Sequence, residues 1–107
     1  MIHLTEIANQ LRNALIQMRD ASLAIVDEKS YKETTKKYDC VLLGEKFNKL
    51  GSYELLHSLK KNFDVEMTNE ELLEYLPTVC KTLDMQLEGL QRVDKLGEIS
   101  AYFIELH

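Results

Sequence analysis

Apolar residues recur at alternating intervals of three and four positions through the first quarter of the chain. On a helix this spacing places them in a single seam, and the other face between Leu4 and Ile25 carries Gln, Arg, Asn and Asp. Because no Gly or Pro interrupts the stretch, the pattern predicts a helix of about six turns within residues 1–28. The seam consists of Leu4, Ile7, Ala8, Leu11, Ala14, Leu15, Met18, Ala21 and Ile25.

A second helix is predicted to begin at Ser30, because Ser30 and Glu33 have the spacing of a capping box. Apolar residues continue at helical spacing as far as Gly51, which offers a left-handed stop. Gly44 weakens this helix, and β-forming residues cluster from Tyr38 to Leu43, so a short strand there is the alternative. The apolar side of the helix would comprise Tyr38, Leu42, Phe47 and Leu50, with either Val41 or Glu45.

Three further helices are predicted between Ser52 and Gly89. Ser52 caps the first, which spans about ten residues. The capping box from Thr68 to Glu71 opens the second, after a single-bridge strand over Val65 to Met67. Pro77 ends the second helix and starts the third, which runs to Gly89. Their buried faces are predicted to be Leu55, Leu56, Leu59 and Phe63; Leu72, Leu73 and Leu76; and Val79, Cys80, Leu83 and Leu87.

The last part of the chain changes to a β pattern. Residues 90–93 and 99–106 form two short runs, of which the second is rich in β-branched and aromatic residues. The turn-forming segment from Asp94 to Gly97 separates them, which predicts a β-hairpin. The expected fold is therefore mainly α with a small carboxyl-terminal β-hairpin, an α+β protein. It is predicted to be a single domain over 1–107, in which a long helix at 1–28 precedes a helical core at 30–107.

The order of the later elements resembles a winged helix-turn-helix domain over Ser52 to Leu106. Tyr53 to Leu59 is similar to the first helix of its three-helix core, and Met67 to Leu76 is similar to the capped second helix. The segment from Thr78 to Leu90 resembles a recognition helix that runs into the first strand of the wing. The resemblance covers about half of the chain and consists of spacings, without an invariant motif.

This resemblance implies a small DNA-binding regulator of transcription. In such domains the third helix enters the major groove, and the tip of the wing touches the backbone or the minor groove. The candidate contacts therefore belong to the outward face of the third helix and to the wing. They are Thr78, Lys81, Thr82 and Met85 on the helix, with Arg92 and Lys95 in the wing.

Charge is distributed unevenly along the 107 residues, whose net charge is −5. Residues 62–107 hold three basic residues against ten acidic ones, whereas residues 29–61 hold eight lysines against four acidic residues. Contacts to phosphate would then come mainly from the lysine-rich middle of the chain and would depend on salt. A solvated helix face is the simpler interpretation of such lysines. The candidates are Lys36, Lys37, Lys60 and Lys61.

The acidic carboxyl-terminal half supports an alternative function. An acidic surface complements a basic protein, so the chain would be an adaptor or inhibitor that reuses the winged fold for protein binding. A phage-type or mobile-element inhibitor of a nucleic-acid enzyme would fit such a surface. DNA binding is the preferred hypothesis, because the resemblance to winged domains favours it.

No motif for catalysis or for a cofactor is present in the sequence. The chain lacks glycine-rich phosphate loops, a nucleophile elbow and a zincin helix, so neither an enzyme nor a cofactor is expected. No metal is expected either, because zinc-ligand spacing is missing at His3, His57, His107, Cys40 and Cys80. Both cysteines lie among apolar residues, which predicts that they are buried as small hydrophobes.

Two observations bear on the compartment. The small number of cysteines and the absence of a signal-peptide pattern at Met1 predict a reducing, cytoplasmic environment. Apolar runs such as Cys40 to Leu43 are far too short to span a membrane, so no membrane partner is expected.

The amino-terminal seam suggests an oligomeric state. The seam can pack on the chain's own core or on a second copy, and small Ala14 and Ala21 permit close approach of helices either way. Its length favours a homodimer, because a winged domain alone does not need so long a helix to cover itself. The predicted interface consists of Leu4, Ile7, Leu11, Ala14, Leu15, Met18 and Ile25.

Overall fold

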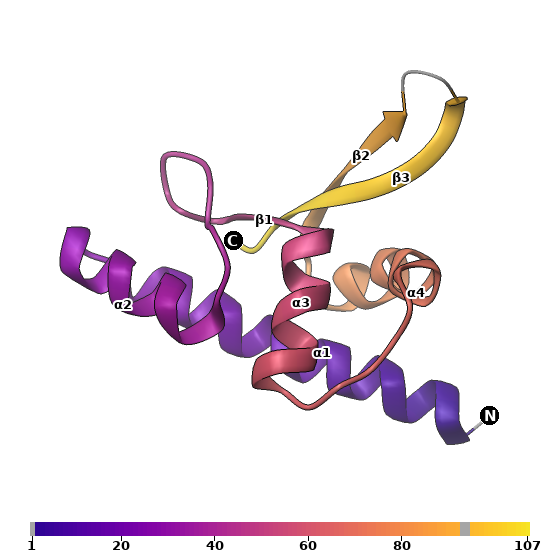
Figure 1. Cartoon of the computed structure of the whole chain (residues 1–107), viewed down its shortest axis with the longest axis horizontal. Helices are drawn as coiled ribbons and strands as arrows, with labels where there is room; N and C mark the ends of the chain where they lie inside the picture. Colours follow the sequence, from indigo (N-terminus) through magenta and orange to yellow (C-terminus); the bar gives the residue numbers. More distant parts are fainter. Residues whose placement is uncertain (1, 93–94) are drawn as a thin grey trace.

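The computed structural model describes the backbone of residues 2–92 and 95–107 and the side chains of residues 6–90 and 99–107. Over these residues the chain is an α+β protein, in which four helices accompany a small antiparallel sheet (Figure 1). In chain order, the elements are α1 (Ile2–Leu23), α2 (Glu28–Tyr38), β1 (Lys49–Gly51), α3 (Ser52–Asn62), α4 (Asn69–Thr82), β2 (Gln86–Arg92) and β3 (Lys95–Glu105).

Helix α1 is the long amphipathic helix that the apolar spacing predicts. It contacts α2 and α4 and spans most of the width of the molecule (Figure 1). The seam residues that are buried in the core of this one chain are Ile7, Leu11, Ala14, Leu15 and Met18. Ile25 is half-buried, and the side chain of Leu4 lies outside the described residues. The chain's own core therefore covers these five residues.

Helix α2 begins and ends earlier than the sequence pattern predicts. Asp27 is its N-cap and accepts a hydrogen bond from the Ser30 N–H at 2.8 Å, so Ser30 is the third helical residue rather than the cap. The helix ends at Tyr38, and Asp39 then adopts a left-handed conformation with φ of 49°. The prediction of a helix that continues to Gly51 is therefore wrong.

The segment between α2 and β1 is irregular apart from an isolated bridge at Leu43, so the alternative strand over Tyr38 to Leu43 does not form either. Leu42 and Leu50 are both buried, and between them the chain makes a turn in which Gly44 has φ of 88°. Leu43 and Lys49 face each other across this turn and exchange hydrogen bonds of 2.8 and 3.0 Å. Burial of leucines on both sides of the turn outweighs the helical propensity of the segment.

Helix α3 confirms the helix predicted after Gly51. Gly51 is its N-cap, and Ser52 is its first residue rather than the cap. The fully buried Ser52 Oγ accepts a hydrogen bond from the Tyr102 N–H of β3 at 3.0 Å, which ties the helix to the sheet. As predicted, the inward residues are Leu55 and Leu59, which are buried, and Leu56 and Phe63, which are half-buried.

Helix α4 passes through Pro77 without a break, so the two helices predicted on either side of this proline are one. The predicted capping box is present, because the Thr68 side chain accepts from the Glu71 N–H at 3.1 Å and Glu71 accepts from the Thr68 N–H at 3.0 Å. The buried face continues on both sides of the proline through Leu72, Leu76, Val79 and Cys80. Its packing offsets the hydrogen bond that Pro77 cannot donate.

The end of α4 corrects two further predictions. The helix ends at Thr82 rather than at Gly89, since Asp84 reverses the chain with φ of 57° and β2 follows. Leu87 therefore lies in a strand. Met85, predicted to face outward as a DNA contact, lies beyond the helix and is only 6% exposed, because it packs in the core.

The sheet has the strand order β1–β3–β2, and both pairs are antiparallel. Ile104 of the central strand is opposite Leu50 of β1 and Leu87 of β2, and it is fully buried. Strands β2 and β3 extend beyond the helices as a long arm (Figure 1). The sheet therefore covers the core where Ile104 lies between Leu50 and Leu87, and the far ends of β2 and β3 project away from it.

Within the described residues, neither the predicted hairpin turn nor the predicted strand before α4 forms as predicted. The sequence predicts the turn from Asp94 to Gly97, but residues 93–94 lie outside the described residues and Lys95 to Gly97 belong to β3. Within the part of the chain that the structure describes, no strand forms over Val65 to Met67. That segment leads from α3 into the capping box of α4.

Candidate functional site

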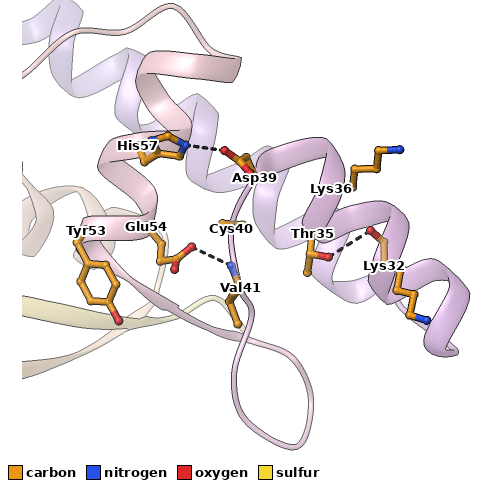
Figure 2. Close-up of a pocket in the computed structure, with 9 residues that line it drawn as sticks. All are labelled: Lys32, Thr35, Lys36, Asp39, Cys40, Val41, Tyr53, Glu54 and His57. Carbon is orange, nitrogen blue, oxygen red and sulfur yellow. Dashed lines mark hydrogen bonds and ion pairs between the residues drawn. The ribbon is translucent and has the colours of Figure 1, made fainter.

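A groove of about 600 Å³ lies between α2 and α3, with the segment that follows α2 at its floor (Figure 2). We refer to it as the α2–α3 groove. Figure 2 shows α2 along one wall and α3 along the other. The lining residues are Lys32, Thr35 and Lys36 of α2, Asp39, Cys40 and Val41 of the following segment, and Tyr53, Glu54 and His57 of α3.

Asp39, His57 and Lys61 form a charged cluster at one end of the groove. Oδ2 of Asp39 lies 2.6 Å from Nε2 of His57 and 3.0 Å from Nζ of Lys61. Asp39 is presented there because it is the left-handed residue that ends α2, while its two partners lie one turn apart on α3. Hydrogen bonds with His57 and then Lys61 hold the pKa of Asp39 below its usual 3.8. The cluster joins the end of α2 to α3.

Two more hydrogen bonds attach the irregular segment and the last residue of α2 to α3. Oε2 of Glu54 accepts from the Val41 N–H at 2.9 Å, at the floor of the groove. Near the end of α3, the Asn62 side-chain amide donates to the carbonyl oxygen of Tyr38 at 2.9 Å. Together with the Asp39 contacts, these bonds fix the separation of the two walls of the groove.

Four exposed lysines lie in the last turns of α2 and α3, and we refer to Lys36, Lys37, Lys60 and Lys61 as the lysine corner. Each helix carries two of them in its last turn, where the partial negative charge of a helix end favours cations. The bond between Lys61 and Asp39 brings the two helix ends together. Among the described residues, Lys61 is the one member of the corner that forms an ion pair.

The sequence-predicted contacts on α4 are not among the residues that line the groove. Thr78, Lys81 and Thr82 are exposed, although Oγ1 of Thr82 donates to the Val79 carbonyl oxygen at 2.7 Å. Met85 is buried and has no surface for a ligand. The side chains of the two predicted wing contacts, Arg92 and Lys95, lie outside the described residues.

A second groove, of about 680 Å³, lies between α3 and the start of α4, and we refer to it as the α3–α4 groove. Tyr53 and His57 line both grooves, so the exposed face of α3 forms a ridge between them. The two grooves differ in charge. Opposite α3, the α2–α3 groove carries Lys32 and Lys36, whereas the α3–α4 groove carries Glu66 and Glu71. The lining residues are Tyr53, Leu56, His57, Lys60, Val65, Glu66, Met67, Thr68 and Glu71.

Comparison with known proteins adds no relative. No protein-family model matches this chain, and no curated protein and no solved structure matches it. In the described residues, no three side chains of His, Cys, Asp or Glu gather as metal ligands would. In the same part of the chain, no helix is long and apolar enough to cross a membrane.

The buried nucleophilic side chains are poorly placed to react. Burial raises the pKa of Cys40 to about 12 and that of Cys80 to about 11, and both thiols are buried as the sequence predicts. Ser22 Oγ lies 3.0 Å from Nε2 of His107, but it donates its proton to the Phe47 carbonyl oxygen at 2.7 Å. Because Ser22 is also only 2% exposed, this pair holds the end of the chain in place and is closed to a substrate.

Sequence reasoning missed the Asp39 cluster and the groove beside it. His57 and Asp39 are separated by 18 positions, and no spacing rule links them. One local signal was present, an Asp directly after two lysines and a tyrosine, since Asp tolerates the left-handed conformation that ends a helix. The lysines are visible individually in the sequence, but the position of Lys36 and Lys37 at a helix end depends on α2 ending at Tyr38.

Proposed function

We propose that this protein is a small non-enzymatic regulator that binds duplex DNA, with the lysine corner as its phosphate-contacting surface. The observation that carries the proposal is that two lysine pairs lie in the last turns of α2 and α3, two helices joined by the bond between Lys61 and Asp39. Exposed, clustered lysines attract the phosphate backbone and release its counterions. Residues 29–61, which include the lysine corner, hold eight lysines against four acidic residues, whereas residues 62–107 hold three basic residues against ten acidic ones.

The order of elements supports a winged-helix type of DNA-binding protein. From α2 to β3 the chain runs helix, strand, helix, helix, strand, strand, an order that resembles a winged helix-turn-helix domain. The correspondence is shifted by one element from the sequence-based one, because α2 takes the place of the first helix and α3 that of the second. Helix α4 is then the third helix, and the arm formed by β2 and β3 is the wing (Figure 1).

The charge of α4 supports a contact centred on the lysine corner. The exposed face of α4 carries Glu70 and Glu74 as well as Thr78, Lys81 and Thr82. Carboxylates on this face would repel the phosphates on either side of a major groove. Base contacts by the threonines and Lys81 stay a prediction, which charge-reversal variants on α4 test separately.

Fluorescence anisotropy of a labelled random-sequence duplex tests the proposal. Lys37→Glu combined with Lys60→Glu is expected to weaken binding about tenfold or more, because two phosphate contacts become repulsive. The matched control is Lys46→Glu with Lys49→Glu, which makes the same change in net charge at the turn before β1 and in β1. It is expected to weaken binding much less.

The two sets of variants separate position from net charge. Equal losses in both double variants would contradict a localised contact and reduce the effect to overall charge. A larger loss from Lys81→Glu than from the corner variants would place the contact on α4 instead.

A second candidate function is docking on a basic protein, and the α3–α4 groove favours it. Half-buried Leu56 and Met67 give this groove an apolar part, while Glu66 and Glu71 line the same groove. An apolar patch rimmed by carboxylates suits a partner with apolar and basic side chains. Capture of a stoichiometric partner from lysate at low salt, abolished by Glu66→Lys but not by Glu45→Lys, would favour this function over DNA binding.

A further inference from the structure

The connection between α3 and α4 has the side-chain alternation of a strand but no strand partner among the described residues. Val65 is buried and Met67 half-buried, whereas Glu66 between them and Thr68 after them are exposed. Successive side chains of an extended strand point to opposite sides in this way. In the hydrogen bonds of the described residues, the main-chain N–H and C=O groups of Glu66 and Met67 take no part. The connection therefore presents a short unpaired edge.

Both ends of this edge are held in place. The Val65 N–H donates to the Leu59 carbonyl oxygen at 2.9 Å, near the end of α3. At the other end, the capping box of α4 uses the N–H of Thr68. Neighbouring residues of a strand direct their main-chain groups to opposite edges, so either Glu66 or Met67 directs its N–H and C=O toward α3. A partner would therefore meet an edge that is already ordered.

The edge borders the α3–α4 groove, whose volume of about 680 Å³ leaves room for a short peptide. In Figure 1 the connection runs from the end of α3 to the start of α4. Half-buried Leu56 of α3, half-buried Met67 and buried Val65 supply the apolar part of the groove. An apolar side chain of a peptide beside the edge would remove this surface from water.

The charges next to the edge are negative. Glu66 belongs to the edge, and Glu71 lines the groove from the first turn of α4. On the α3 wall, Lys60 is exposed, and His57 is bonded to Asp39. Basic side chains of a peptide paired with the edge would therefore lie beside carboxylates, whereas acidic ones would be repelled.

We propose that the α3–α4 groove binds an extended peptide, which adds as a strand beside Glu66 and Met67 and carries an apolar side chain flanked by basic ones. The apolar side chain contacts Leu56 and Met67, and a basic neighbour, which points to the other side of the extended peptide, faces Glu66. A helical partner fits less well, because its main-chain groups are already bonded to one another. The inference rests on the second candidate function, docking on a basic protein, and specifies the segment that would dock.

Titration of isotope-labelled protein with a capped Ser-Arg-Leu-Arg-Ser peptide, followed by amide chemical shifts, tests the groove. The largest shifts are expected at Leu56, Glu66 and Met67. Replacement of the leucine by serine, or of both arginines by glutamate, is expected to weaken binding about tenfold or more. These changes are in the peptide, so the fold of the protein is unaffected. Equal binding of the three peptides, or binding of none, would overturn the proposal.

Methylation of peptide nitrogens separates strand addition from binding by side chains alone. Alternate N–H groups of a strand face its partner, so methylation of the leucine nitrogen and of the next arginine nitrogen should have unequal effects. One should weaken binding about tenfold and the other much less. In the complex, the amide proton of either Glu66 or Met67 should exchange more slowly with solvent. Equal effects of the two methylations, or unchanged exchange at both amides, would overturn strand addition.

Charge reversal locates the peptide on the protein. Glu66→Lys is expected to weaken the arginine peptide about tenfold and to bind the glutamate peptide more tightly than wild type does. Glu70→Lys is the matched control, because Glu70 is exposed in the first turn of α4 and does not line the groove. The melting midpoint of each variant confirms that it folds. Equal losses in the two variants would overturn the site.

A competition experiment separates this inference from the docking function on which it rests. Displacement by the arginine peptide of a basic protein captured from lysate would show that the captured protein uses this edge. A captured protein that stays bound, with no response of the Glu66 and Met67 amides to the peptide, would leave docking standing and overturn the inference. Failure to capture a protein while the peptide still binds would count against docking and not against the groove.

Discussion

The carboxylate of Asp39, at the end of α2, lies 2.6 Å from Nε2 of His57 on α3. This contact, with that of Lys61, connects two helices whose lysine pairs would otherwise be separate features of the surface. Helix α2 ends at Tyr38, and Asp39 follows it in a left-handed conformation from which its carboxylate reaches α3. The lysine corner and the α2–α3 groove both depend on this connection.

Asp39→Asn is expected to destabilise the protein at neutral pH and to change its pH dependence. The pKa of Asp39 is below its usual 3.8 because of hydrogen bonds with His57 and Lys61. A carboxyl group with a lowered pKa in the folded state stabilises the fold above its unfolded pKa, and this contribution is lost as the pH falls through the folded value. Asn keeps the left-handed backbone accessible, so the substitution removes mainly the charge.

Urea unfolding of wild type and Asp39→Asn at pH 7 and near pH 3 checks this expectation. The difference between the two proteins should be present at pH 7 and shrink at the lower pH. Asp64→Asn is the matched control, because Asp64 is also exposed and has φ of 53°. A constant difference between wild type and Asp39→Asn at both pH values would rule out an electrostatic role.

The seam of α1 is expected to stabilise one chain rather than a dimer. Leu11→Ala removes a fully buried side chain and should lower the free energy of unfolding by about 2–5 kcal/mol. Sedimentation equilibrium should give the monomer mass for both proteins. A wild-type dimer that Leu11→Ala converts into monomers of unchanged stability would contradict the packing of this helix on its own core.

Pro77→Ala is expected to stabilise the protein. Pro77 is exposed in the interior of α4, where it donates no backbone hydrogen bond and crowds the preceding turn. Alanine restores the backbone hydrogen bond and relieves the crowding, so the free energy of unfolding should rise by about 1–3 kcal/mol. Thr78→Ala, at the next exposed position, should change it by less than about 0.5 kcal/mol. A loss of stability in Pro77→Ala would mean that the fold requires the proline.

Both cysteines are expected to be unreactive in the folded protein. Burial places the pKa of Cys40 near 12 and that of Cys80 near 11, so almost no thiolate exists at pH 8. Alkylation with iodoacetamide should be slow in buffer and fast in denaturant. Rapid modification of either cysteine without denaturant would show that its surroundings open far more readily than the packed core suggests.

The parts of the fold that the sequence predicts correctly depend on local information. The seam of α1 follows from residues three and four positions apart, such as Leu11, Leu15 and Met18. The start of α4 follows from Thr68 and Glu71, whose reciprocal hydrogen bonds involve only one turn of chain. Neither feature requires knowledge of what the rest of the chain does.

The errors arise where distant contacts decide the structure. β1 forms because Leu50 pairs with Ile104, a partner that no local pattern around Leu50 reveals. Pro77 is tolerated because the buried face of α4 continues past it. Met85 is buried because the chain leaves the helix, and its N–H bonds to the Cys80 carbonyl oxygen at 2.9 Å. Local propensity predicts that a helix breaks at Pro77 and that helices continue to Gly51 and Gly89, and tertiary packing overrides these predictions.

The candidate site could be predicted only in part. Lysines at the ends of α2 and α3 are visible in the sequence, and so is an aromatic residue at Tyr53. Their arrangement around a groove depends on Asp39 reaching His57, a contact between segments with no shared spacing pattern. Sequence therefore supplies the charged groups, and tertiary structure supplies the surface that they form.

The salt dependence of duplex binding tests the central claim most directly. If the lysine corner neutralises three or four phosphates, a plot of log K against log salt concentration should have a slope of about −3 to −4. Lys37→Glu with Lys60→Glu should reduce the steepness of that slope by about two. Absence of binding at low salt, or an affinity that does not change with salt, would contradict the claim that this surface binds DNA.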